Sequence, residues 1–172
     1  MIIRNATLND SAAIAAIYND AVLNSTAIWN EQTVDAANRA AWIGERQAAG
    51  YPVLVAVNGA DEAIGYASFG DWRAWDGYRH TVEHSVYVHQ AHRGEGIGKA
   101  LLIALIARAR EIGKHVMVAG IESGNQASIK LHLALGFREV GRMEQGGAKF
   151  GQWLDLTFLQ LTLDERTAPP AR

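Results

Sequence analysis

The sequence predicts a domain of the α/β or α+β class, with helices packed on a mixed β-sheet. Segments with strand and helix patterns alternate along the 172 residues. Asn58-Gly59 separates two apolar stretches and predicts a hairpin turn. A strand-like stretch near Ser85 leads through a glycine-rich loop into a long apolar helix. We expect one domain over residues 1–165, followed by a disordered tail, 166–172.

The first half of the chain predicts a strand, two helices and a hairpin, in that order. Asn9 or Asp10 can cap the first helix, and Gly50 can end the second. The predicted elements are a strand from Ile2, helices at 11–24 and 33–49, and strands at 52–57 and 63–69. The following loop, 70–81, carries large side chains where most loops carry small polar ones, so we expect it to line a site.

The second half predicts alternating strands and helices. Gly113 and Gly136 end the two helices, and Gly146-Gly147 is expected to break the chain. The stretch after Lys114 shows no polar alternation, which predicts a strand buried on both faces. The predicted elements are strands at 82–88, 115–121, 137–143 and 153–163 and helices at 97–111 and 125–135.

Composition excludes several kinds of function. The net charge of −2 gives no reason to expect nucleic acid or a membrane as a partner. The absence of cysteine excludes disulfides, cysteine nucleophiles and thiolate metal sites. No apolar run has transmembrane length and the N-terminus lacks a signal-peptide layout, so we expect a soluble, cytoplasmic protein. The neighbouring His80, His84, His89 and His92 lack metal-ligand spacing, so no metal site is expected.

The glycine-rich loop 93–99 lies between a strand and a helix, where backbone N–H groups can bind a phosphate. The mononucleotide P-loop pattern fails, because its first glycine falls on Arg93 and Ala100 replaces its hydroxyl residue. The dinucleotide pattern fails because its third glycine falls on Lys99 or Leu101. A plain turn needs fewer than three glycines. The pattern that fits is Arg/Gln-x-x-Gly-x-Gly/Ala, met by Arg93, Gly96 and Gly98.

This loop resembles the acyl-CoA loop of the GNAT family of N-acetyltransferases, and residues 125–137 resemble the family's Asn-led helix ending in Leu-Gly-Phe. The resemblance covers nearly the whole chain. It implies a mixed, mostly antiparallel sheet with splayed parallel strands at its centre, helices on both faces, and acetyl-CoA as co-substrate. The residues it implies for acetyl-CoA are Val86, Tyr87, Val88, Arg93, Gly94, Glu95, Gly96, Ile97, Gly98, Lys99, Asn125 and Ser128.

A narrower resemblance is carried by the stretches 18–22, 26–29, 70–73, 81–88 and 149–155. They resemble the phosphinothricin and methionine sulfoximine N-acetyltransferase subgroup. This implies direct acetyl transfer to the α-amine of a small amino acid or of an analogue such as methionine sulfoximine, methionine sulfone or phosphinothricin. The subgroup is generally dimeric, so we expect a homodimer. The alternatives are acetylation of a protein N-terminus or another amine, and a non-catalytic acyl-CoA-binding sensor.

Glu83 is the first candidate catalytic residue. An α-amine has a pKa of about 8, so a modest base is enough to deprotonate it near neutral pH. A carboxylate in an apolar strand is costly unless it is used or paired, and the alternative is a buried ion pair with Arg73 or Arg79. Strand alternation predicts Glu83 and Ser85 on one face of the sheet and His84 on the other.

His132 and Arg73 are the other candidates. His132 stands where the family often has a tyrosine that protonates the departing thiolate, and the alternative is that it only packs beneath the cofactor. A guanidinium matches a carboxylate bidentately, so Arg73 is the candidate clamp for the acceptor's carboxylate, the alternative being a solvated loop arginine. The resemblance implies substrate contacts for Arg73, Ala74, Trp75, Glu83, His84 and Ser85.

Overall fold

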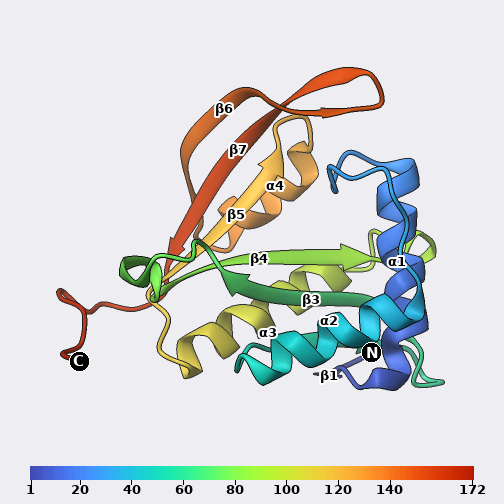
Figure 1. Cartoon of the computed structure of the whole chain (residues 1–172), viewed down its shortest axis with the longest axis horizontal. Coiled ribbons are helices and arrows are strands. Elements are labelled where there is room, and N and C mark those ends of the chain that lie inside the picture. Colours follow the sequence, from blue (N-terminus) through green and yellow to red (C-terminus); the bar gives the residue numbers. More distant parts are fainter.

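The computed structural model describes all 172 residues and contains one seven-stranded sheet with four α-helices. The strands are β1 (Ile2–Asn5), β2 (Val53–Val57), β3 (Ala63–Asp71), β4 (Thr81–Val88), β5 (Val116–Glu122), β6 (Arg138–Lys149) and β7 (Gln152–Thr162). The helices are α1 (Ser11–Asn24), α2 (Ala36–Ala48), α3 (Ile97–Glu111) and α4 (Gln126–Ala134). The strand order is β1-β2-β3-β4-β5-β7-β6, and every neighbouring pair is antiparallel except β4 and β5 (Figure 1). The predicted mixed, mostly antiparallel fold is confirmed.

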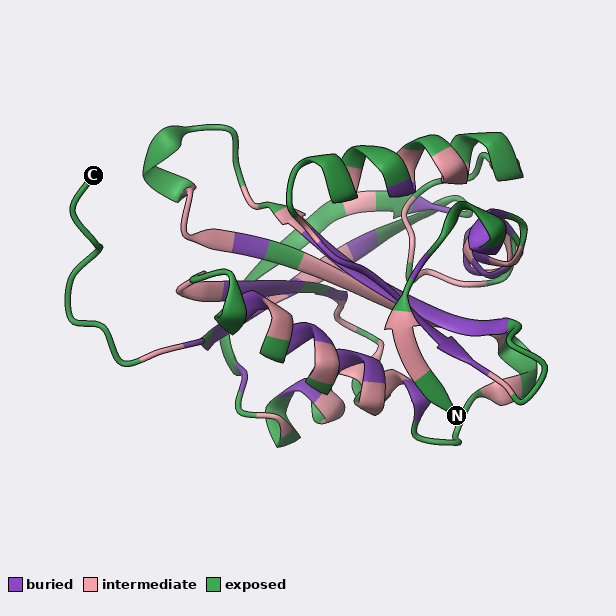
Figure 2. Cartoon of the chain, turned by 90° about the horizontal axis from the view of Figure 1, so that it is seen from below, coloured by how far each residue is buried: buried purple, intermediate pink, exposed green.

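Helices cover both faces of the sheet (Figure 2). On one face, Ile14 and Ile17 of α1 and Ile43 of α2 pack on Tyr66. On the other face, a row of apolar α3 side chains spaced by four residues forms the larger core cluster with β2–β5 and β7: Ile97, Leu101 and Leu105. None of the helices is both long enough and apolar enough to cross a membrane.

The two parallel strands separate halfway along their length. β4 pairs with β5 only from Thr81 to Glu83, and the last pair is Glu83 with Val118. Beyond it, β4 stays paired with β3 as far as Val88, and β5 stays paired with β7 as far as Glu122. The strands therefore diverge, as Figure 1 shows, and the implied splay is confirmed.

The helix predicted from residue 33 begins only at Ala36. The side chain of Asn19 bonds both the N–H and the C=O of Val34 at 2.8 Å, which holds that residue outside the helix. Asp35 then caps α2 by accepting from the N–H of Asn38 at 2.8 Å. β3 also runs two residues further than predicted, to Asp71, and the other boundaries differ by a residue or so, except the end of β6.

The prediction that Gly146-Gly147 breaks the chain is wrong. β6 continues to Lys149, and a register shift between Met143 and Gly147 absorbs the glycines. Gln145 takes the left-handed backbone conformation within this irregularity, with φ 53°. The ring of Trp29 occupies the space that a side chain at residue 147 would need, so this glycine admits the tryptophan rather than ending the strand.

The tip of the β6–β7 hairpin fixes the loop that follows α1. Lys149 is buried, and its ammonium donates to the carbonyls of Ser25 at 2.6 Å and Ile28 at 2.5 Å. Burial lowers the pKa of Lys149. Glu31 accepts from the N–H of Phe150 at 3.2 Å. These contacts hold the loop in one position against the hairpin. Ala27 of this loop lines the cavity at the gap between β4 and β5.

Candidate active site

A cavity of about 470 Å³ opens where β4 and β5 separate. Its walls come from β4, the loop before α3, β5 and α4. Of the residues implied to bind acetyl-CoA, those that line it are Val86, Tyr87, Val88, Arg93, Gly94, Gly96, Ile97, Gly98, Lys99, Asn125 and Ser128. Glu95 does not line the cavity, and its carboxylate lies 3.3 Å from Nδ1 of His92.

The loop 93–99 presents unpaired backbone donors to this cavity. None of its N–H groups bonds within the protein, and no side chain caps α3. Gly94 (φ 81°) and Gly96 (φ 79°) adopt the left-handed conformation that only glycine takes without strain. Free N–H groups at the start of a 15-residue helix suit a phosphate, so the loop fits the pyrophosphate of coenzyme A.

The two cations of this loop differ in their surroundings. The Arg93 guanidinium donates to Asp20 of α1 at 3.0 Å, which ties the loop to that helix. Lys99 is exposed and makes no hydrogen bond or ion pair through its side chain. His92 also lines the cavity. The free positive charge nearest the phosphate donors is therefore that of Lys99.

The remaining walls fit the pantetheine arm. Residues 86–88 of β4 face the cavity along the edge from which β5 has departed, so an extended chain with its own amides can pair there. Asn125 caps α4 by accepting from the N–H of Ser128 at 3.2 Å. Its side-chain NH₂ remains free to donate into the cavity.

His84 and His132 form a neutral pair on the α4 side of the sheet. Their Nε2 atoms are 2.9 Å apart, and Nδ1 of His132 donates to the carbonyl of Ser128 at 2.7 Å. His132 must therefore accept through Nε2, and His84 must donate. Burial lowers the pKa of His84 to about 3 and also lowers that of His132. This geometry leaves His132 without a free N–H and favours the interpretation that it packs beneath the cofactor.

Glu83 lies on the opposite face of β4 from His84. Its carboxylate is exposed, so the argument that its strand position makes it costly does not hold. The predicted alternative ion pair is not formed, because Arg79 lies 3.7 Å from Asp76 and Arg73 stacks on Trp72. The surrounding protein still removes enough water to raise the pKa of Glu83, against the opposing charges of Arg73 and Arg46.

Gly120 connects this carboxylate with the cavity. It lines the cavity from β5, and a Cβ built on it would lie 3.4 Å from Oε2 of Glu83. The carboxylate is thus at the edge of the gap into which the cofactor's acetyl end would project. One feature of the sequence could have identified Gly120, because a glycine inside a strand often marks a place where a ligand or another backbone approaches closely.

Ser85, another implied substrate residue, lies on β4 and lines the cofactor cavity, whereas the remaining three lie on the loop after β3. Arg73, Ala74 and Trp75 are exposed, and none of them lines the cofactor cavity. The Arg73 guanidinium lies 4.8 Å from the Trp72 ring centre, and that ring packs edge-on against Phe158 of β7 at 5.9 Å. Arg73 makes no hydrogen bond or ion pair, so its donors are available to a ligand on the Glu83 face.

No group of three or more His, Asp or Glu side chains in the structure could hold a metal ion. The cavity, the unpaired donors of the loop and the open edge of β4 together define an acyl-CoA site.

The chain belongs to the acetyltransferase (GNAT) family, whose pattern matches residues 14–137. It is 64% identical to L-amino acid N-acyltransferase MnaT of Escherichia coli and 62% identical to L-methionine sulfoximine/L-methionine sulfone acetyltransferase of Salmonella typhimurium, over 172 residues and 99% of each chain in both cases. An acetyltransferase from Salmonella typhimurium, solved with its cofactor acetyl-CoA, has a TM-score of 0.96 and 61% identity, covering 100% of this chain and 99% of that one. The protein is an acetyl-CoA-dependent acetyltransferase.

We expect Gly98→Trp to abolish acetyl-CoA binding. Gly98 has an ordinary backbone conformation, and a Cβ there would lie 3.6 Å from Val88 on the cavity wall, so the substitution fills the site without straining the helix. Loss of several charge-assisted bonds should weaken affinity about 100-fold or more, measured by calorimetry. The control is Gly44→Trp on exposed α2, where nothing lies within 4 Å. Unchanged affinity of the first variant would contradict the phosphate-loop assignment.

Proposed function

We propose that the protein acetylates the α-amine of small L-amino acids or of analogues such as methionine sulfoximine, methionine sulfone and phosphinothricin. The observation that carries this is the exposed, unpaired carboxylate of Glu83 beside Gly120, at the edge of the cofactor cavity. A carboxylate there can receive an acceptor ammonium from solvent. The names of the four relatives that are more than 60% identical support amino acids or their analogues as the acceptors.

Glu83 acts as the base in this proposal. It takes one proton from the acceptor's ammonium, directly or through a water, and its raised pKa suits that task. The amine then attacks directly. A carbon–nitrogen bond forms, the carbon–sulfur bond of the thioester breaks, and the second amine proton ends on the departing sulfur. Bound acetyl-CoA supplies the activated acetyl group.

His132 in this proposal positions the cofactor and does not supply a proton. Its Nδ1–H is committed to the Ser128 carbonyl and its Nε2 faces His84. A thiolate whose conjugate acid has a pKa of about 8.5 can leave without a general acid. Most of the acceleration then comes from holding the amine and the thioester in place, worth several kcal/mol, roughly 7–11 in favourable cases.

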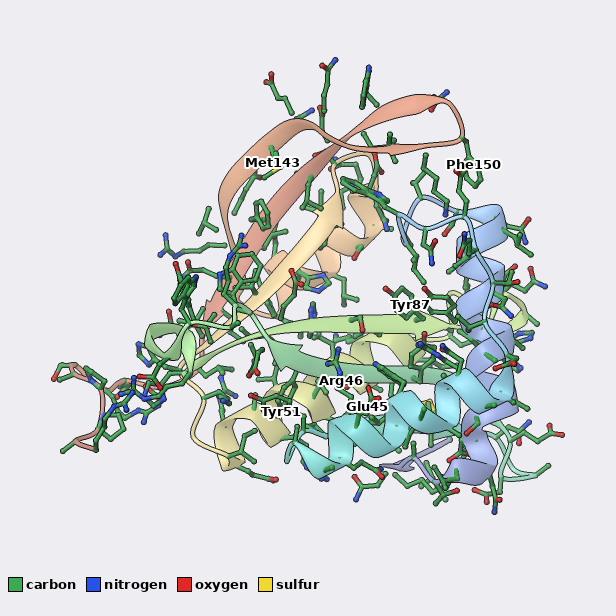
Figure 3. The ribbon with its side chains drawn as sticks, viewed as in Figure 1. Glu45, Arg46, Tyr51, Tyr87, Met143 and Phe150 are labelled. Atoms are coloured by element: carbon green, nitrogen blue, oxygen red, sulfur yellow. The ribbon has the colours of Figure 1, made fainter.

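We also propose that the protein is a cytoplasmic homodimer with a small-molecule acceptor, and that it has no nucleic-acid or membrane partner. Large apolar side chains are exposed on the β6–β7 hairpin and the loop after β3 (Figure 3 labels the first two): Phe150 51%, Met143 49%, Trp153 69% and Trp75 78%. Exposed apolar side chains of this size can form part of an interface between two copies of the chain.

Sedimentation velocity at micromolar concentration should give twice the chain mass of 18.7 kDa. Trp153→Lys should shift the protein toward the single-chain mass if the hairpin forms the interface. A wild-type protein that sediments as one chain would overturn the dimer proposal.

We expect Glu83→Gln to lower kcat/KM about 100-fold or more at pH 6.5. The loss should shrink toward pH 9, because an acceptor amine with a pKa of about 8 is then already deprotonated. In the wild type, activity should fall as pH drops through the pKa of Glu83, and since that pKa is raised the fall begins at higher pH than for a free glutamate. The control is Glu139→Gln, exposed on β6. An equal loss at every pH would instead assign Glu83 a binding role.

A thiol-release assay with acetyl-CoA tests the substrate class. L-Amino acids and methionine sulfone should release thiol faster than the matching amines without a carboxylate. Arg73→Ala should raise KM for amino acids about tenfold or more, since a charge-assisted pair is lost, and leave KM for the amines unchanged. The control is Arg138→Ala, also exposed and unpaired. Faster acetylation of a peptide N-terminus than of every amino acid would contradict the proposal.

A further inference from the structure

The guanidinium of Arg46 is half-buried yet makes no hydrogen bond or ion pair with the protein. Two other arginines, Arg73 and Arg138, also lack such partners, but both are exposed. Removing water from a charged group costs free energy, and this desolvation lowers the pKa of Arg46 against the opposing charge of nearby Asp71. An arginine kept in this state has all five donors available to a ligand.

The structure holds this guanidinium in one place. It rises from α2 toward β3 and β4 (Figure 3) and lies over Gly70, where a Cβ would be only 2.5 Å from its Nη1. Gly70 has no positive φ, so the glycine is needed for space and not for backbone conformation. The Trp42 ring lies 5.5 Å away, and the guanidinium also lines a cavity of about 240 Å³ between α2 and the end of β3. Arg46 is therefore positioned before any ligand arrives.

The position of Arg46 relates it to Glu83. Gly70, beneath the guanidinium, is the cross-strand partner of Glu83 in the β3–β4 pairing. Arg73 lies on the other side, because it stacks on Trp72, which packs against β7. Two unpaired arginines thus flank the carboxylate that would receive the acceptor's ammonium.

We infer that Arg46 is a specificity-determining residue that binds the end of the acceptor's side chain, while Arg73 binds the α-carboxylate. The preferred acceptors are then α-amino acids whose side chain ends in two or more hydrogen-bond-accepting oxygens, such as a sulfone or a carboxylate. A guanidinium fork matches paired oxygens in a way that an ammonium does not. This inference rests on the proposed amino-acid acetylation.

The test compares L-methionine sulfone with L-methionine, which differ only in the two side-chain oxygens. The wild type should prefer the sulfone in kcat/KM. Arg46→Met should lower that preference about tenfold or more and leave kcat/KM for methionine within about threefold. Arg46→Lys should restore only part of it. Gly70→Ala, which keeps the charge but displaces the guanidinium, should reproduce the loss.

Controls separate this effect from misfolding and from general electrostatics. Arg138→Met should leave the preference intact. All variants should keep wild-type acetyl-CoA affinity by calorimetry, because Arg46 does not line the cofactor cavity. An unchanged preference in Arg46→Met, or an equal loss for both acceptors, would overturn the Arg46 inference alone. A wild type that acetylates neither amino acid would overturn the proposed function and the inference with it.

Discussion

The parallel strands β4 and β5 separate after the Glu83–Val118 pair, and this separation opens the cavity that fits the cofactor. β4 stays paired with β3, and β5 with β7, to the end of each strand, so only the parallel β4–β5 pairing is interrupted. Backbone groups left without partners are costly to bury in an apolar core. Here they border a cavity of about 470 Å³ instead, where the amides of a cofactor arm can pair with them.

Strand alternation places the neighbouring side chains of Glu83 and His84 on opposite faces of the sheet. His84 points toward α4 and pairs with His132, on the side where the loop 93–99 and the start of α3 lie. Glu83 points to the other face, near Arg46. The histidine pair and the Glu83 carboxylate therefore lie on opposite faces of the sheet beside the gap. Gly120 lines the cavity and lies close to Glu83, so it connects the two.

Contacts between distant segments complete the site. Lys149 on β6 reaches Ser25 across 124 residues of sequence, and Trp29 lies against Gly147. Together they fix the loop that brings Ala27 to the cavity wall. A buried ammonium bonded to carbonyls imposes one arrangement, because any movement leaves both the charge and its acceptors unpaired. The shape of the site thus depends on the hairpin as much as on the motifs.

Local signals in the sequence predicted the element order, the glycine loop before α3 and the Asn125 cap of α4, because turn glycines and helix caps act over a few neighbouring residues. The sequence did not predict that Glu83 is exposed, that Nδ1 of His132 donates to the Ser128 carbonyl, or that the Trp29 ring packs against Gly147. It gave no sign of Arg46, since an arginine on a helix is ordinary until Gly70 is seen beneath it. These points follow from the folded structure, because each depends on contacts between segments that lie far apart in the chain.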